Sequence, residues 1–102
     1  MARITEEDAR NMLGNVPEEN VFYCHGGRVL RNTAELRDCL ASMSDETFAY
    51  HVNPEKNDFS NWVRDVIGDD KLARDLNRAK NRPAAEKSVA ERLVFLQKKV
   101  AA

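Results

Sequence analysis

Residues 48–68 read FAYHVNPEKNDFSNWVRDVIG, and this stretch decides the fold of the chain around it. Its apolar residues recur at intervals of three and four, the spacing of one face of an α-helix: Phe59, Trp62, Val63, Val66 and Ile67. Asn57 or Asp58 can cap the start of this helix, and Gly68 can end it in a left-handed turn. The pattern predicts a helix over residues 58–67, with Trp62 in the core.

Similar start and stop signals divide the rest of the chain into helices. Thr5 caps a first helix that stops at Gly14, Asn32 or Thr33 opens a second, and Ser44 caps a third over residues 45–51. Asp69 or Asp70 then caps a helix over about 71–80. Pro83 suits the first position of a last helix that runs to about residue 100.

Residues 21–31 read VFYCHGGRVLR, in which two short apolar runs flank a pair of glycines. This is the pattern of a β-hairpin. We therefore expect a mainly α, α+β fold of about six short helices with one short β-hairpin near residues 21–31. Residues 1–102 form a single domain, with a core over about 21–80 and a C-terminal helix over about 83–100.

Length and composition narrow the class of protein. No apolar run in the 102 residues approaches the roughly 20 residues of a membrane span. The first residues, MARITEED, lack the apolar core of a signal peptide. Two cysteines are too few for a disulfide framework and suit a reducing compartment. A cytoplasmic location is the expectation, with no membrane partner.

Charge is distributed unevenly along the chain. Residues 1–70 carry a net charge of −7, whereas residues 71–102 carry +6. The basic part can dock on the acidic part of the same chain, or it can bind nucleic acid. In the second case residues 58–80 resemble a helix-turn-helix, and five side chains would face phosphate: Lys71, Arg74, Arg78, Lys80 and Arg82. The aspartates at 69, 70 and 75 weaken that interpretation.

Residues capable of catalysis or metal binding are few. Cys24, His25, Cys39 and His51 are potential zinc ligands, but no two of them have the spacing of a zinc site. Cys39 with His51, or His51 with Asp58, could form a weak catalytic pair. No nucleophile elbow or phosphate-binding loop accompanies either pair. We expect no metal, no cofactor and no enzymatic activity.

The best candidate binding site is a polar cluster in the deciding stretch, made of His51, Asn53, Asn57, Asp58, Asn61 and Trp62. These residue types cap helices and also bind ligands. The alternative is that they form a capping network, in which Asn and Asp satisfy helix ends and His51 bridges the turn to Asp58. In that case the function lies elsewhere, on the edge of the hairpin or on the last helix.

The run from His51 to Asn53, together with residues 57–69 and Leu72-Ala73, resembles a family of small domains of unknown function from archaea and some bacteria. The resemblance extends from Phe22 to about Ala79, and includes the Phe22–Cys24 strand, Leu36 and residues 43–48. It implies a compact module that stands alone or is attached to larger proteins. The family has no settled activity, so the resemblance assigns no catalytic residue.

These observations predict a small cytosolic binding or interaction module whose partner is an unknown protein. A homodimer is also expected for two reasons. The hairpin would otherwise leave an unpaired edge. The last helix also carries an apolar seam, broadened by Val94 and Phe95, that consists of Val89, Leu93, Leu96 and Val100.

Overall fold

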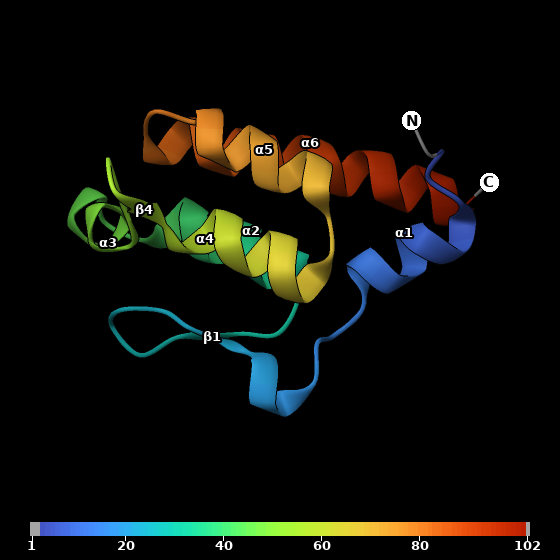
Figure 1. Cartoon of the computed structure of the whole chain (residues 1–102), viewed down its shortest axis with the longest axis horizontal. Coiled ribbons are helices and arrows are strands. Elements are labelled where there is room, and N and C mark those ends of the chain that lie inside the picture. Colours follow the sequence, from blue (N-terminus) through green and yellow to red (C-terminus); the bar gives the residue numbers. More distant parts are fainter. Residues whose placement is uncertain (1–2, 102) are drawn as a thin grey trace.

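The computed structural model describes residues 3–101 as a layered helical domain with two small hairpins (Figure 1). The helices are α1 (Glu6–Leu13), α2 (Thr33–Ser42), α3 (Asp45–His51), α4 (Asp58–Trp62), α5 (Asp70–Arg78) and α6 (Arg82–Ala101), with a 3-10 turn η1 (Glu18–Asn20) and a π-helical turn η2 (Val63–Ile67). The strands are β1 (Phe22–Tyr23), β2 (Val29–Leu30), β3 (Val52–Asn53) and β4 (Lys56–Asn57). The mainly α, α+β class is confirmed.

The long helix α6 forms one side of the domain and packs against α1, α2 and α5. α4 and η2 lie beside α5 and run in the opposite direction, while the β1–β2 hairpin covers the face of the helices away from α5 and α6 (Figure 1). The largest fully buried side chains fill the space between these layers, among them Phe59, Leu36, Leu40, Leu72, Leu76 and Leu96. Trp62 is also buried, as its place in the apolar face predicts.

The capping residues explain where each helix begins. The side chains of Thr5, Asn32, Ser44, Asn57 and Asp69 each accept a hydrogen bond from a backbone N–H in the first turn of the following helix. Each satisfies one of the donors that a helix start leaves free. Gly68 ends η2 at φ +84°, in the left-handed region that favours glycine. These start and stop signals are confirmed, with Asn57 and Asp69 as the caps.

Two features of the fold differ from the expectation of one hairpin and a regular helix over 58–67. β3 and β4 pair antiparallel, with Val52 opposite Asn57 and Asn53 opposite Lys56, so the turn at Pro54 is a second hairpin. Strands of two residues are too short to show the alternation of polar and apolar side chains that marks a strand. The second difference is η2, where the Gly68 N–H bonds to the Val63 carbonyl at 2.8 Å and widens the last turn.

Most of the apolar seam of α6 is buried inside the domain, and Val100 at its end is half-buried. Val89 and Leu96 are fully buried and Leu93 is nearly so, against α1, α2 and α5. Val94 and Phe95 remain exposed on the other side of the helix. The buried part of the seam is therefore not available to a second copy, and homodimerisation stays a prediction that depends on the hairpin edge and on the exposed Val94 and Phe95. Of the helices described, none combines the length and apolarity that crossing a membrane requires.

A buried ion pair fastens α6 to the start of α5. The Asp69 carboxylate accepts from Arg92 Nε at 2.8 Å and from Arg92 Nη2 at 2.9 Å, and also from the Leu72 N–H at 3.2 Å. Both side chains are almost wholly enclosed. Arg82, at the start of α6, makes a more exposed contact with Asp45, whose Oδ1 lies 3.3 Å from Arg82 Nε. The basic C-terminal part thus docks in part on acids from earlier in the chain, as one interpretation of its charge predicts.

Candidate functional site

The predicted polar cluster is assembled around His51, at the end of α3. His51 is buried, with only 4% of its surface exposed, and both of its ring nitrogens are engaged. Nε2 accepts the backbone N–H of His25 at 2.9 Å, and Nδ1 lies 3.0 Å from Asp58 Oδ2. Because Nε2 must present a lone pair to His25, Nδ1 carries the proton and donates it to Asp58. The predicted bridge across the turn is present.

Asp58 is the open partner of this pair. Its side chain is 31% exposed, and Lys56 Nζ also lies 3.0 Å from its Oδ2. Burial alone would raise the pKa of the Asp58 carboxyl, but the hydrogen bonds from His51 and Lys56 outweigh it and lower that pKa below its ordinary value. The carboxylate is therefore held ionised at neutral pH, between one buried donor and one exposed cation.

Asn57 and Trp62 have structural partners. The Asn57 side chain accepts the Ser60 N–H at 3.0 Å and donates to the Leu76 carbonyl at 3.2 Å, so one amide caps α4 and ties it to α5. Trp62 Nε1 donates to the Asn20 carbonyl at 2.8 Å. Of the six predicted site residues, His51, Asn57 and Trp62 thus lie in the packed interior or at its edge. For these three, the capping-network alternative describes their contacts.

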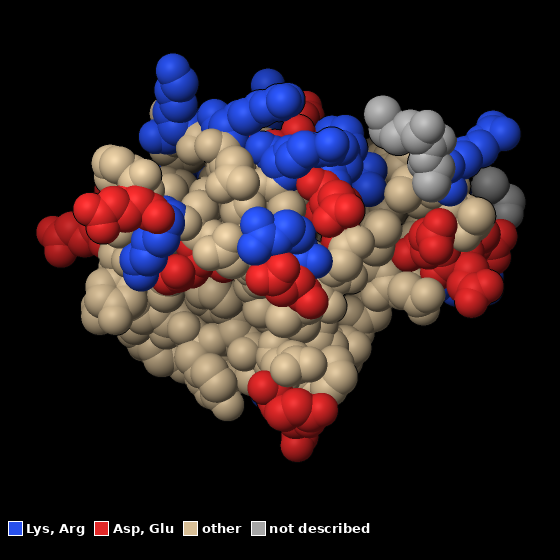
Figure 2. Space-filling view, in the orientation of Figure 1, with Lys and Arg blue, Asp and Glu red and all other residues tan. Residues whose placement is uncertain are grey.

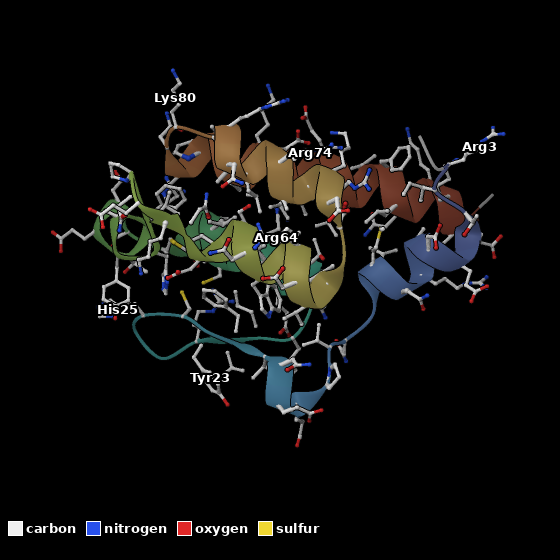
Figure 3. The ribbon with its side chains drawn as sticks, in the orientation of Figure 1. Arg3, Tyr23, His25, Arg64, Arg74 and Lys80 are labelled. Atoms are coloured by element: carbon white, nitrogen blue, oxygen red, sulfur yellow. The ribbon has the colours of Figure 1, made fainter. Side chains whose placement is uncertain are left out.

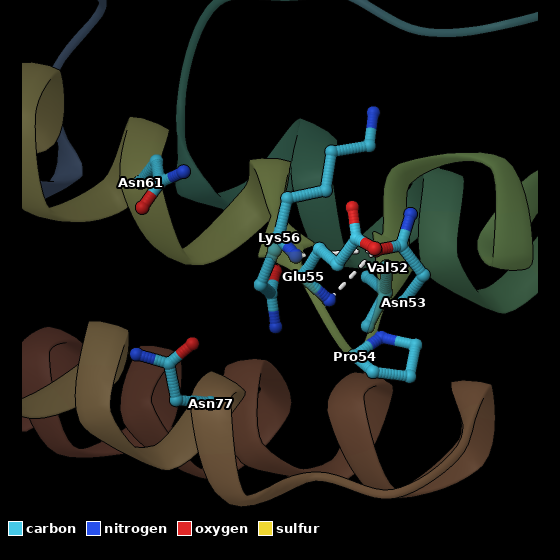
Figure 4. Close-up of a pocket in the computed structure, with 8 residues that line it drawn as sticks. Val52, Asn53, Pro54, Glu55, Lys56, Asn61 and Asn77 are labelled. Atoms are coloured by element: carbon cyan, nitrogen blue, oxygen red, sulfur yellow. Dashed lines mark hydrogen bonds between the residues drawn. The ribbon is translucent and has the colours of Figure 1, made fainter.

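Asn53 and Asn61 instead line an open groove of about 440 Å³ between the β3–β4 hairpin, α4 and α5. Figure 4 shows Asn61 of α4 and Asn77 of α5 on facing helices, with Pro54 and the β3–β4 turn beside them. Val52, Glu55, Lys56 and Asn57 complete the lining. We call this feature the amide groove, because four asparagines from three segments contribute to its wall.

Several amide groups of the groove remain free to bind a ligand. The Asn53 Oδ1 accepts the N–H groups of Glu55 and Lys56 at 2.9 and 3.2 Å, whereas its Nδ2 has no partner among the described residues. From the described part of the chain, Asn61 Oδ1 receives only a long contact of 3.4 Å from Arg64 Nη2. Within residues 3–101, the Asn77 side chain makes no hydrogen bond, and it is exposed. An asparagine amide offers two donors and one acceptor, so the groove presents donors and acceptors together.

Asn77 did not figure among the predicted site residues. It lies in the exposed face of α5, sixteen positions after Asn61 in the sequence. Only the antiparallel packing of α4 on α5 brings the two amides to one groove. A polar residue in an exposed helical face carries no signal of its own, so the sequence offered no means of selecting it.

The cysteines form a buried pair rather than part of a catalytic or metal site. Cys39 Sγ lies 3.5 Å from Cys24 Sγ, and both thiols are free. Burial raises the pKa of the Cys24 thiol to about 12, and the hydrogen bond from Cys39 adds to this effect. Cys39 does not meet His51, whose ring nitrogens are taken. Over residues 3–101 no group of three or more His, Cys, Asp or Glu side chains is arranged to hold a metal ion.

The five cations proposed for nucleic acid are not equivalent. Lys71 is paired with Asp75 one turn along α5. Arg82 Nη1 donates to the Leu40 carbonyl at 2.9 Å, and its Nε lies 3.3 Å from Asp45. Arg74, Arg78 and Lys80 are exposed. Because α4 and α5 lie antiparallel side by side, they do not have the near-perpendicular crossing of a helix-turn-helix (Figure 1).

A second exposed feature lies where the β1–β2 hairpin meets Tyr50 of α3. Tyr23 is 73% exposed and Tyr50 is 55% exposed. The His25 ring stacks on Tyr50 with their centroids 4.1 Å apart. Figure 3 places Tyr23 and His25 on the hairpin side of the molecule, and in Figure 2 that side is largely free of charged side chains. We call it the hairpin surface; it corresponds to the hairpin location that the capping-network alternative predicts for function.

Comparison of the chain with family models, with curated proteins and with solved structures finds no match in any of the three. The function is therefore inferred from the geometry of the amide groove and of the exposed surfaces. The resemblance to a family of small domains stays a prediction.

Proposed function

We propose that this protein is a non-catalytic interaction module that binds an extended, polar segment of a partner protein in the amide groove. The observation that carries the proposal is the convergence of Asn53, Asn61 and Asn77, from three different segments, on one groove with unused amide groups. An extended peptide exposes alternating N–H and C=O groups. Side-chain amides can pair with both, which charged side chains cannot do.

The composition of the groove supports a neutral ligand. Glu55 and Lys56 contribute one charge of each sign to the wall, and Lys56 is already engaged with Asp58. Val52 and Pro54 add apolar surface against which a side chain of the partner can pack. A volume of about 440 Å³ lies within the range of roughly 300–1,000 Å³ usual for ligand sites.

The chemistry of the surrounding residues favours binding over catalysis. A general base needs a free lone pair within reach of its substrate. His51 offers none, because Nε2 accepts from His25 and Nδ1 faces Asp58. The Cys24 thiol stays protonated at neutral pH. These groups stabilise the wall of the groove instead of acting on a ligand.

The test is a display screen of random 12-residue peptides against the full-length chain, followed by titration of the best binder. The Asn61→Ala/Asn77→Ala double variant removes two hydrogen-bonding groups worth about 0.5–1.5 kcal/mol each, so affinity should fall about tenfold. Tyr23→Ser, on the hairpin surface, is the matched control and should bind as the unaltered chain does. Loss of binding with Tyr23→Ser and retention with the asparagine variant would place the site on the hairpin surface and refute the proposal.

A further inference from the structure

A second surface, on the other side of α5, is strongly basic. Arg74 and Arg78 of α5, Lys80 of the following link and Lys87 of α6 are all exposed. Figure 2 shows lysines and arginines gathered along the edge of the molecule that α5 and α6 form in Figure 1. Figure 3 shows Lys80 extending from this edge into solvent. We call these four residues the basic face.

The cations of the basic face lack the acidic partners that most other cations of the described chain have. Elsewhere in the chain, ion pairs engage Arg10, Arg31, Arg37, Lys56, Arg64 and Arg92. Among the described residues, no carboxylate lies within ion-pairing distance of Arg74, Arg78, Lys80 or Lys87. Unpaired like charges repel one another and weaken the folded state. Four of them on one face form a surface whose charge is complementary to a polyanion.

A shallow groove of about 470 Å³ separates α5 from α6 at this face. Arg78 lines one wall, and Lys87 with Ser88 lines the other, so donors approach from both sides. The acids of the groove only partly offset this charge, because Asp75 is bound to Lys71 and Glu91 is the other carboxylate in the lining. The groove therefore presents cations and a hydroxyl together, the groups that contact phosphate.

The lack of aromatic side chains in this groove favours duplex over single-stranded nucleic acid as its ligand. Proteins that bind single strands stack bases on exposed aromatic rings. No aromatic residue lines the α5–α6 groove. The exposed tyrosines lie on the hairpin surface, and the exposed Phe95 lies further along α6, outside the groove. Duplex DNA also gives more counterion release for each phosphate neutralised than a single strand does. Arginine and lysine contacts to its backbone need no stacking platform.

We propose that the basic face, Arg74, Arg78, Lys80 and Lys87, binds the phosphate backbone of duplex DNA without reading its sequence. This function goes beyond the peptide site, since α5 separates the two grooves: Asn77 lines one and Arg78 the other. In this mode of binding no helix of a helix-turn-helix enters a groove of the DNA, and the protein contacts only phosphates. Four such contacts predict a slope of about −3.6 for log K against log salt.

The test is fluorescence anisotropy of a labelled 20-base-pair duplex of mixed sequence with the full-length chain. Between 50 and 200 mM salt the affinity should fall about 150-fold, as the slope of about −3.6 requires. Arg74→Gln/Arg78→Gln should bind at least about tenfold more weakly at 50 mM salt and halve the slope, because two of four contacts are lost. Lys98→Gln/Lys99→Gln, near the far end of α6, is the matched control and should leave both the affinity and the salt slope unchanged.

Circular dichroism of each variant establishes that it is folded, since all four substituted side chains lie outside the core. The proposal is overturned by any of three results: no binding at 50 mM salt, an equal loss in the control, or an unchanged slope in Arg74→Gln/Arg78→Gln. Single-stranded DNA and duplex RNA of the same sequence are the competing probes. Tighter binding to either would also overturn the assignment to duplex DNA.

Discussion

Two aspartates at the starts of neighbouring helices, Asp69 before α5 and Asp58 in α4, lie in opposite surroundings. Asp69 is sealed, with 1% of its surface exposed and two hydrogen bonds from Arg92. Asp58 lies beside the amide groove, and 31% of its side chain is exposed. Of its two partners, His51 is buried and Lys56 lies in the groove wall. The sealed pair joins helices, whereas the open carboxylate lies where a partner protein can approach.

Under the proposed function, the fold and the binding of a partner therefore depend on separate polar contacts. No ligand can reach Asp69 without unfolding the contact between α5 and α6. The groove beside Asp58 can take up a ligand while His51 still holds that carboxylate from the interior. Substitutions at the sealed pair should thus act on stability, and substitutions in the groove wall should act on binding.

Breaking the sealed pair should have the largest effect. Arg92→Met leaves the Asp69 carboxylate buried without its cation, and should lower the free energy of unfolding by about 3–5 kcal/mol. Urea denaturation measures it. In Arg92→Met/Asp69→Asn the buried charge is gone and asparagine still caps α5, so part of the loss should be recovered. A loss below about 1 kcal/mol in Arg92→Met would contradict the sealed environment.

Breaking the open pair should have a smaller effect. Asp58→Ala removes the acceptor of the buried His51 Nδ1–H and should cost about 1–2 kcal/mol. Lys56→Ala, which removes only the exposed partner of the same carboxylate, should cost less than about 1 kcal/mol. Asn57→Ala tests the cap of α4 separately and should cost about 1 kcal/mol. Thermal denaturation compares the three variants. An unchanged midpoint in Asp58→Ala would show that the hydrogen bond between His51 and Asp58 does not stabilise the fold.

The ionisation of Asp58 should make the smallest contribution, as a dependence of stability on pH. The pKa of Asp58 is lower in the folded chain than its ordinary value of 3.8, so the unfolded chain binds the proton more readily. The ionised carboxylate stabilises the fold above that value, and the contribution is lost as pH falls through the lower folded pKa. The stability difference between the unaltered chain and Asp58→Asn should be constant near neutral pH and shrink in acid. A difference that widens in acid would contradict this sign.

Much of the fold was predictable because its signals are local. Caps such as Ser44 and the left-handed Gly68 act within one helical turn, so the residues themselves identify helix ends. The β1–β2 hairpin was predictable from Gly26-Gly27 between apolar runs. The β3–β4 pairing was missed because these strands are too short for their residues to show an alternating pattern. Arg92 was missed as the partner of Asp69 because 23 positions separate them and only packing joins them.

The candidate site was predictable in part for the same reason. Asn53 and Asn61 were selected because they lie within one conspicuous stretch, and the structure places both in the amide groove. His51 and Trp62 were selected for their residue types, and both prove to be buried with their polar atoms bonded. Asn77 and Lys87 depend on how α5 packs between α4 and α6, which no local pattern reveals.

The amide groove as the peptide site is the central claim, and one measurement tests it most directly. ¹H–¹⁵N correlation spectra resolve the side-chain amide signals of asparagines, which can be followed while the selected peptide is added. The account predicts that the largest changes occur in the side-chain amides of Asn53, Asn61 and Asn77, which offer unused hydrogen-bonding groups. Unchanged asparagine amides, with the changes concentrated at Tyr23 and Tyr50, would contradict it.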